Sequence, residues 1–346
     1  MVIVTAYACI LTVFTTFVLL KTFVIPDAQI TGTTGAGIYA DVMEDISIAD
    51  ENNDTSDSDD TSHNRMHKGH GPGSSSSGKI DRHNQSNNNR SDEGSTSDSS
   101  STLTEDLSYS DDNINITVAE KRVNDTNVYI ADVQVSSMKY LRAAFAQNTY
   151  GRNIKETTSE MASEHNAILA INGDYYGFRD YGYVIRNGVL YRDTYNNDED
   201  EFFVMYEDGN CDIVTADSTT AQELLDNGVV QAFAFGPGLI KNSQIAVDIN
   251  TEVDQSMASN PRTAIGMISP LHYVFVVSDG RTSESEGLTL YQLAEVLQDL
   301  GCTTAYNLDG GGSTTMYFNG EVINNPTTNG HNTSEREVSD IVYIGK

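Results

Sequence analysis

A mixed α+β domain with a large, mostly antiparallel sheet and few helices is the fold class that this 346-residue sequence predicts. Apolar segments of strand length recur through most of the chain after residue 113, and they do not alternate regularly with helical segments. Only three segments in that region have the character of helices. Asn187-Gly188 separates two of the strand segments and is a strong signal for an antiparallel hairpin. A doubly wound parallel fold is therefore disfavoured.

The chain begins with an apolar run at residues 2–20, followed by Lys21 and a second short run that ends at Pro26. About 20 apolar residues suffice to cross a bilayer as a helix, and no clear cleavage site of a signal peptide follows. We therefore expect residues 1–25 to form a transmembrane signal anchor. Lys21 is the one nearby base, and its downstream position weakly favours a cytoplasmic location for that side.

Between residues 50 and 102 the composition is dominated by Ser, Asp, Asn, Gly and Thr, with almost no large apolar side chains. Such a segment cannot bury enough apolar surface to offset the entropy lost on ordering. The sequence thus predicts a disordered spacer over residues 26–112 and one folded domain over residues 113–346.

Within the folded domain, the apolar patterns place strands and helices in a definite order. Strands are expected at residues 114–118, 127–135, 140–146, 167–171, 183–186, 189–192, 202–206, 212–215, 229–235, 261–268, 273–277, 303–308, 316–318 and 338–344. Helices are expected at residues 158–165, with Thr157 or Thr158 as the N-cap, at 220–226, stopped by Asn227-Gly228, and at 288–300, stopped by Gly301.

The charge and the cysteines exclude several classes of protein. The chain has 50 acidic and 20 basic residues, a formal net charge of −30, which disfavours an electrostatic grip on nucleic acid. Its three cysteines fit neither a disulfide framework nor a zinc site, although Cys211 and Cys302 could pair with each other.

A glycine-rich turn is the most informative motif in the chain. Residues 306–316 read Tyr-Asn-Leu-Asp-Gly-Gly-Gly-Ser-Thr-Thr-Met, so that an apolar strand runs into an acid, three glycines and three hydroxyls. Consecutive glycines are kept where the backbone takes unusual dihedral angles or lies against a ligand. A simple hairpin capped by Asp309 is the alternative. The lack of a following lysine excludes a P-loop, and Ser313 lacks the spacing of a nucleophile elbow.

Three apolar strands end in an acid beside a glycine, at Gly173-Asp174, Asp279-Gly280 and Asp309-Gly310. Each acid alone would be an ordinary turn residue. Their repetition at strand ends favours the hypothesis that the three carboxylates meet in one cleft.

The motifs around these acids occur together in a fixed order. They are Asn172-Gly173-Asp174-Tyr175-Tyr176, Phe235-Gly236-Pro237, Asn260-Pro261-Arg262-Thr263-Ala264-Ile265-Gly266, Ser278-Asp279-Gly280-Arg281, Asn307-Leu308-Asp309-Gly310-Gly311-Gly312-Ser313 and Arg336. In this order they resemble the phosphodiester glycosidase family, over roughly residues 120–344. The apolar N-terminus and the spacer resemble those of membrane-tethered bacterial members. This resemblance implies an extracytoplasmic catalytic domain with a cell-envelope or exopolysaccharide substrate.

The resemblance implies hydrolysis of the C1–O bond of a sugar-1-phosphodiester, with release of a sugar and a phosphomonoester. Phosphate is a good leaving group, so neutralising its charge matters more than protonating it. The expected catalytic residues are Asp174, Asp309, Asp279 and Arg262. The expected substrate contacts are Asn172, Gly173, Tyr175, Gly236, Arg281, Asn307, Gly310, Gly311, Gly312, Ser313, Thr314 and Arg336.

Two other hypotheses remain at this point. The three acids could hold a divalent cation in a phosphodiesterase that breaks a P–O bond, whereas the glycosidase requires no cofactor. Alternatively, the domain could be a non-catalytic module that binds an envelope glycan.

Overall fold

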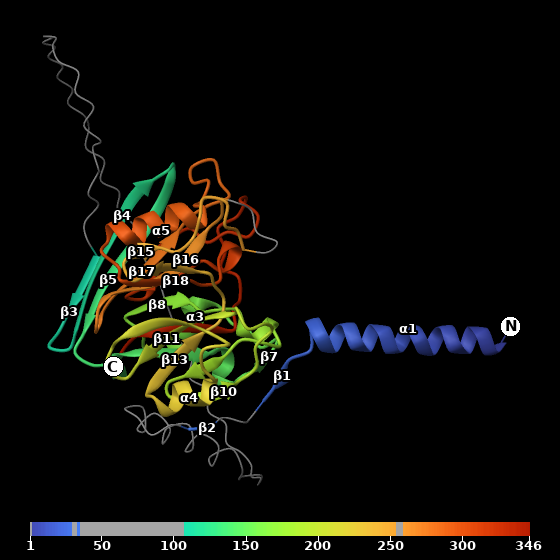
Figure 1. The fold of residues 1–346 in the computed structure, drawn as a ribbon. Helices are drawn as coiled ribbons and strands as arrows, with labels where there is room; N and C mark the ends of the chain where they lie inside the picture. Colours follow the sequence, from blue (N-terminus) through green and yellow to red (C-terminus); the bar gives the residue numbers. More distant parts are fainter. Residues whose placement is uncertain (1, 30–32, 35–106, 254–258) are drawn as a thin grey trace, which may run out of the picture. The chain divides into compact units, whose positions relative to one another are not determined.

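The computed structural model describes residues 2–29, 33–34, 107–253 and 259–346 (Figure 1). Most of the predicted spacer lies outside these residues, but three short strands fall within its limits and pair with the folded domain. Helix α1 occupies Val2–Phe23, where the membrane anchor was expected. No helix formed by the described residues is both long and apolar enough to cross a membrane.

Three antiparallel sheets and a two-stranded ribbon make up the described part of the chain. The eight-stranded sheet has the order β15 (Gln244–Ile245), β14 (Gly238–Lys241), β18 (Thr304–Asn307), β16 (Arg262–Ser269), β17 (His272–Ser278), β5 (Thr126–Val135), β4 (Ile114–Val123) and β3 (Leu107–Ser110). The six-stranded sheet has the order β12 (Cys211–Thr215), β11 (Glu201–Tyr206), β13 (Val229–Phe233), β9 (Val184–Arg186), β10 (Val189–Arg192) and β2 (Thr33–Thr34). The five-stranded sheet has the order β20 (Glu321–Val322), β19 (Met316–Phe318), β8 (Leu169–Asn172), β21 (Asp340–Ile344) and β6 (Leu141–Phe145). In the ribbon, β1 (Asp27–Ala28) pairs with β7 (Gly151–Arg152).

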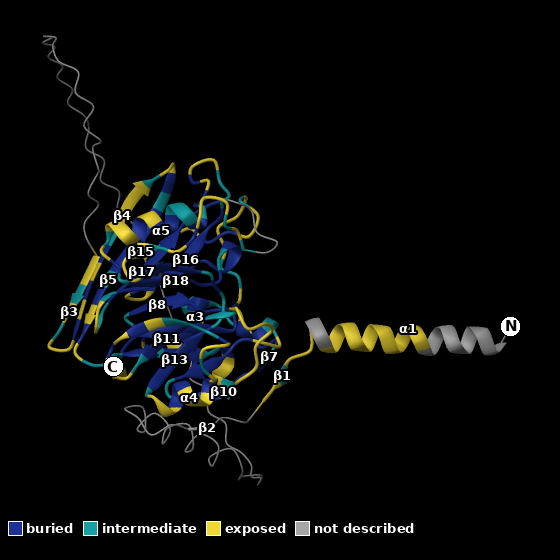
Figure 2. Cartoon of the chain, viewed as in Figure 1, coloured by how far each residue is buried: buried dark blue, intermediate teal, exposed yellow. Residues whose placement is uncertain are grey.

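The predicted α+β class with mostly antiparallel strands is confirmed, but the strands form three sheets instead of one large sheet. The reason is the shared core. Apolar side chains from all three sheets, including Phe203, Phe275 and Val342, pack into one buried cluster between them (Figure 2). Strands β16 and β17 are buried along nearly their whole length because α5 (Leu290–Asp299) and its cluster cover their other face. A single sheet of so many strands would leave much of this surface uncovered.

Each of the three short helices in the folded domain begins at a capping box. Thr157 and Glu160 cap α3 (Thr158–Glu164), Thr220 and Glu223 cap α4 (Ala221–Asp226), and Thr289 and Gln292 cap α5. In each box the threonine hydroxyl accepts from the third helical N–H while the acid or amide accepts from the cap N–H. Short 3₁₀ turns occur at η1 (Met138–Tyr140), η2 (Ala146–Asn148), η3 (Tyr176–Phe178) and η4 (Gly311–Ser313). All three predicted helices are confirmed.

Two local predictions have different outcomes. The Asn187-Gly188 hairpin is confirmed, because both residues have positive φ and Arg186 pairs with Val189 across the turn. A Cys211–Cys302 disulfide is not formed, because both cysteines are free and buried in different apolar clusters.

Candidate functional site

Asn172, the last residue of β8, joins the sheets at the point where several strands end. Its amide nitrogen donates to the Asp309 carbonyl at 2.6 Å, and its amide oxygen accepts from the Thr263 hydroxyl at 2.8 Å and from the Thr315 N–H at 3.2 Å. The next residue continues the junction, because the Asp309 N–H donates to the Gly173 carbonyl at 3.2 Å. The ends of β8 and β18 are thus fixed against each other, with Asp309 directly beside Gly173.

The glycine-rich turn after Asp309 is tightly packed on its inner side. A Cβ at Gly311 would lie 2.7 Å from the Arg281 guanidinium, and its φ of +62° is a conformation that L side chains rarely adopt. Cβ atoms at Gly310 and Gly312 would meet Pro261 and Thr328 at 2.7 and 2.6 Å. Close packing against the protein's own residues therefore explains the three glycines and excludes a free hairpin loop.

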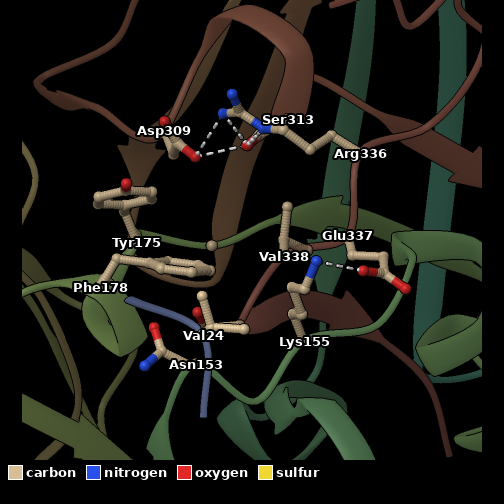
Figure 3. Close-up of a pocket in the computed structure, with 12 residues that line it drawn as sticks. Val24, Asn153, Lys155, Tyr175, Phe178, Asp309, Ser313, Arg336, Glu337 and Val338 are labelled. Carbon is tan, nitrogen blue, oxygen red and sulfur yellow. Dashed lines mark hydrogen bonds and ion pairs between the residues drawn. The ribbon is translucent and has the colours of Figure 1, made fainter. Parts of the chain in front are cut away.

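A pocket of about 390 Å³ opens beside this turn (Figure 3). This volume is within the range of roughly 300–1,000 Å³ that is typical of small-molecule sites. Its walls come from Val24, Asn153, Lys155, Gly173, Tyr175, Phe178, Asp309, Ser313, Arg336, Glu337, Val338 and Ser339.

Asp309, Ser313 and Arg336 form one polar end of the pocket (Figure 3). The Ser313 hydroxyl donates to Asp309 Oδ2 at 2.5 Å, and Arg336 Nη2 donates to Ser313 Oγ at 2.5 Å and to Asp309 Oδ2 at 3.3 Å. Burial raises the pKa of Asp309 above its usual value, although Arg336 and Ser313 act in the opposite direction. The carboxyl group is therefore more easily protonated than an exposed aspartic acid.

Arg281 lies behind the glycine-rich turn and adds positive charge to this end of the pocket. Its Nε donates to Asn260 Oδ1 at 2.9 Å and its Nη1 to the Thr328 carbonyl at 2.6 Å, so the guanidinium is held in place. Burial lowers the pKa of Arg281, and the nearby positive charge of Arg336 lowers it further, whereas Asp309 raises it. Arg281 and Arg336 thus place two positive charges near the single carboxyl group of Asp309. This excess of positive charge favours an anionic ligand.

An aromatic wall stands beside this polar end. Tyr175 and Phe178 stack with their ring centroids 4.7 Å apart and their planes 25° from parallel. Tyr175 has a φ of +71°, an uncommon conformation for a non-glycine residue, and its side chain is partly exposed. Partly exposed aromatic rings of this kind are suited to stacking against the apolar face of a ring-shaped ligand.

Asp174 does not line the pocket, although it directly follows Gly173. Its carboxylate is fully buried, lies 3.0 Å from Arg186 Nη2, and accepts from the Ala234 N–H at 2.7 Å and the Tyr176 N–H at 3.2 Å. Arg186 also donates to Asp340 Oδ2 from Nε at 2.9 Å and from Nη2 at 2.8 Å. The structure thus places Asp174 in a buried ion-pair cluster behind the pocket.

This buried cluster contains two acids and one base, so one negative charge is in excess. Burial raises the pKa of Asp340 to about 7, with Asp174 adding to the rise and Arg186 opposing it. A proton on Asp340 relieves the excess charge. The pKa of Asp340 is therefore higher in the folded chain than in the unfolded chain. Its proton contributes fully to the free energy of unfolding below about pH 4, and this contribution is lost as the pH rises to about 7.

Replacing Asp340 by Asn is expected to flatten the pH dependence of stability in that window. As the pH rises through this window, the unfolding free energy of the wild type should fall by roughly 1 kcal/mol per pH unit relative to that of the variant. The reason is that the amide of the variant cannot become charged. Urea unfolding of both proteins at pH 4 to 8 measures the difference, with the exposed Asp299→Asn as the control. Identical pH slopes for wild type and Asp340→Asn would contradict the assignment.

Asp279 and Arg262 lie at other strand ends and are also absent from the pocket lining. Asp279 holds the segment after β20, accepting from the Asn325 backbone N–H at 2.8 Å and from its side chain at 2.9 Å. Arg262 is buried and its Nε donates to the Leu288 carbonyl at 3.0 Å. The three acids are therefore not gathered in one cleft. Among the described residues, no group of three or more His, Cys, Asp or Glu is placed so that it could hold a metal ion.

The predicted site residues fall into two groups. Those that line the pocket are Gly173, Tyr175, Asp309, Ser313 and Arg336. Those that lie outside its lining are Asp174, Asp279, Arg262, Asn172, Gly236, Arg281, Asn307, Gly310, Gly311, Gly312 and Thr314. Several of the second group support the first, as Asn172 does by donating to the Asp309 carbonyl at 2.6 Å.

Sequence reasoning missed Lys155, Phe178 and Glu337 in the pocket and Arg186 and Asp340 behind it. Arg186 and Asp340 carried a usable signal, since each is a charged residue at the end of a strongly apolar strand. Lys155 lies in a segment without a distinctive pattern, and no such signal marks it.

The antiparallel α+β fold thus carries at its strand ends a pocket of small-molecule size, with an arginine–aspartate pair at one end and a stacked aromatic pair beside it. The chain belongs to the phosphodiester glycosidase family, because the model of that family matches residues 165–345, more than half of the chain.

Two curated relatives support this membership. The SPbeta prophage-derived uncharacterized protein YomE of Bacillus subtilis (strain 168) is 33% identical over 182 residues, which cover 51% of this chain and 28% of that protein. The human N-acetylglucosamine-1-phosphodiester alpha-N-acetylglucosaminidase is 31% identical over 140 residues, which cover 36% of this chain and 27% of that enzyme. The matched region thus spans little more than a quarter of the length of these relatives.

A solved structure has the same fold. The catalytic domain of the zebrafish N-acetylglucosamine-1-phosphodiester alpha-N-acetylglucosaminidase, auto-inhibited by its pro-peptide, superposes with a TM-score of 0.54. The superposition covers 67% of this chain and 83% of that chain at 21% sequence identity.

Proposed function

We propose that this protein hydrolyses the glycosidic C1–O bond of a sugar-1-phosphodiester and releases a free sugar and a phosphomonoester. The observation that carries the proposal is the Asp309–Ser313–Arg336 cluster in a pocket with an aromatic wall. It combines a group that can bind phosphate, a group that can transfer a proton and a surface for a sugar ring. Family membership supports the same class of activity.

In this proposal the phosphodiester anion binds to Arg336, with Arg281 adding positive charge from behind the turn. The substrate draws Arg336 away from Asp309, so the carboxyl group, whose pKa burial already raises, holds a proton beside the anion. The C1–O bond then breaks with its electron pair passing to the phosphate oxygen, and Asp309 delivers its proton there. A water molecule bonds to C1 and releases a proton, which restores Asp309.

The products formed from the methyl phosphodiester of N-acetylglucosamine 1-phosphate in ¹⁸O-labelled water test this reaction. We expect free N-acetylglucosamine and methyl phosphate that carries no label, because water attacks carbon. Methanol and labelled N-acetylglucosamine 1-phosphate would instead indicate cleavage of the P–O bond. Binding of the compound without any product would indicate a glycan-binding module.

We also propose that the physiological substrate is a cell-envelope or exopolysaccharide glycan and that the domain acts outside the cytoplasm. The likeness of the polar spacer sequence to that of bacterial family members supports this location. Protease treatment of intact cells that express the full chain tests it, since an extracytoplasmic domain is degraded while a cytoplasmic reporter survives. Protection of the domain in intact cells would contradict the location.

A further inference from the structure

The pocket has a second polar end, which the reaction above does not use. Lys155 Nζ lies 2.6 Å from Glu337 Oε2, and both side chains are half exposed. Figure 3 places this pair across the pocket from Asp309 and Arg336, with Val338 between the two ends and the aromatic wall of Tyr175 and Phe178 along one side.

The backbone fixes the position of this pair. Glu156 and Val338 form an antiparallel bridge, with the Glu156 N–H donating to the Val338 carbonyl at 3.0 Å and the Val338 N–H to the Glu156 carbonyl at 2.8 Å. Lys155 and Glu337 are the residues immediately before the two bridge partners. Both side chains therefore start from a fixed piece of backbone, and both line the pocket.

The two polar ends differ in charge and in chemistry. At the first end, Arg336 and Arg281 outnumber Asp309, which favours an anion. At the second end, the charges of Lys155 and Glu337 cancel, so this end offers a strong donor and a strong acceptor without net charge. A sugar hydroxyl both donates and accepts, so it can bind to both partners at once, whereas a second anion would be repelled by Glu337.

We propose that Lys155 and Glu337 form the subsite for the sugar hydroxyls most distant from the scissile bond. This inference rests on the proposed function and adds to it the orientation of the substrate in the pocket. The phosphate lies at Arg336, the ring crosses the aromatic wall of Tyr175 and Phe178, and the far edge of the sugar reaches the Lys155–Glu337 pair. The pair is thus a determinant of sugar specificity.

Binding and kinetics of Lys155→Met and Glu337→Gln test the inference. Each variant should weaken binding of N-acetylglucosamine 1-phosphate and raise KM for its methyl phosphodiester roughly tenfold, with kcat nearly unchanged, because one charge-assisted hydrogen bond is lost. Inorganic phosphate should bind equally to both variants and to wild type, whereas Arg336→Met should weaken both ligands. Exposed Lys121→Met and Glu295→Gln are the matched controls.

Sugar selectivity gives a second readout. Wild type should discriminate between the methyl phosphodiesters of N-acetylglucosamine 1-phosphate and of its 4-epimer or its 6-deoxy analogue, and both variants should lose at least tenfold of that discrimination. Unchanged binding and selectivity would overturn the inference, and so would a fall in kcat at constant KM. If the wild type binds the sugar phosphate but cleaves none of these compounds, and the variants lose this binding, only the proposed function would be overturned. A wild type that neither binds nor cleaves these compounds would overturn both.

Discussion

Replacing Asp309 by Asn is expected to lower kcat for sugar release by about 100- to 10,000-fold, the usual contribution of a positioned acid–base group. The amide cannot deliver a proton to the departing phosphate oxygen. The fold should be retained, because the amide oxygen can still accept the hydrogen bond that Ser313 donates to Asp309 Oδ2. Release of free N-acetylglucosamine from the methyl phosphodiester measures kcat, and urea unfolding checks the fold.

Two further measurements sharpen this prediction. Wild-type activity should fall as the pH rises through the pKa of Asp309, and this alkaline decline should be absent from the residual activity of Asp309→Asn. Glu295→Gln, on the exposed face of α5, should behave as wild type. A folded Asp309→Asn protein that keeps more than about a tenth of the wild-type kcat would exclude Asp309 from the reaction.

Replacing Arg186 by Met is expected to have the largest effect on stability, a loss of about 3–5 kcal/mol of unfolding free energy. Arg186 is fully buried and contacts both Asp174 and Asp340, while its guanidinium packs 4.1 Å from the centre of the Phe233 ring. Methionine fills much of the same space but leaves two buried carboxyl groups without a counter-ion.

The triple variant Arg186→Met/Asp174→Asn/Asp340→Asn separates charge from packing. If uncompensated charge causes the loss, the triple variant should unfold at a higher urea concentration than Arg186→Met alone. An equally unstable triple variant would show that the loss comes from packing and from the hydrogen bonds that Arg186 donates to backbone carbonyls. Asp174→Asn alone should reduce stability far less than Arg186→Met, because Arg186 keeps Asp340 as its partner.

Local signals in the sequence were sufficient for the three helices of the folded domain and for the longer strands, but not for short strands such as β14 and β3. The capping threonines, the apolar face of α5 and the Asn187-Gly188 turn each depend on residues within a few positions of one another. The arrangement into three sheets could not be predicted in the same way. Its pairings join distant segments, as β17 joins β5, and the sequence of either strand does not specify its partner.

The candidate site was predicted in part for a similar reason. Asp174, Asp279 and Asp309 all follow apolar strands beside a glycine, so their local sequences cannot tell which one faces a cavity. The difference lies in their distant neighbours. Arg186 and Asp340 draw Asp174 into the interior, and Asn325 binds Asp279, whereas Asp309 lies beside the pocket with Arg336. The family resemblance pointed to the turn that lies beside the pocket, but it did not distinguish these environments.

The two polar ends of the pocket differ in how easily they can be altered. The turn after Asp309 is anchored through the Asn172 amide to three separate strand ends, and added Cβ atoms at its three glycines would meet packed neighbours, so replacing these glycines disturbs the whole junction. Lys155 and Glu337, at the second polar end of the pocket, are half exposed and form an ion pair with each other. Substitutions of such solvated side chains have small effects on stability. Directed evolution toward new sugars should therefore randomise Lys155 and Glu337 and leave the glycine-rich turn intact. The sugar selectivity can then change while the reaction chemistry stays the same.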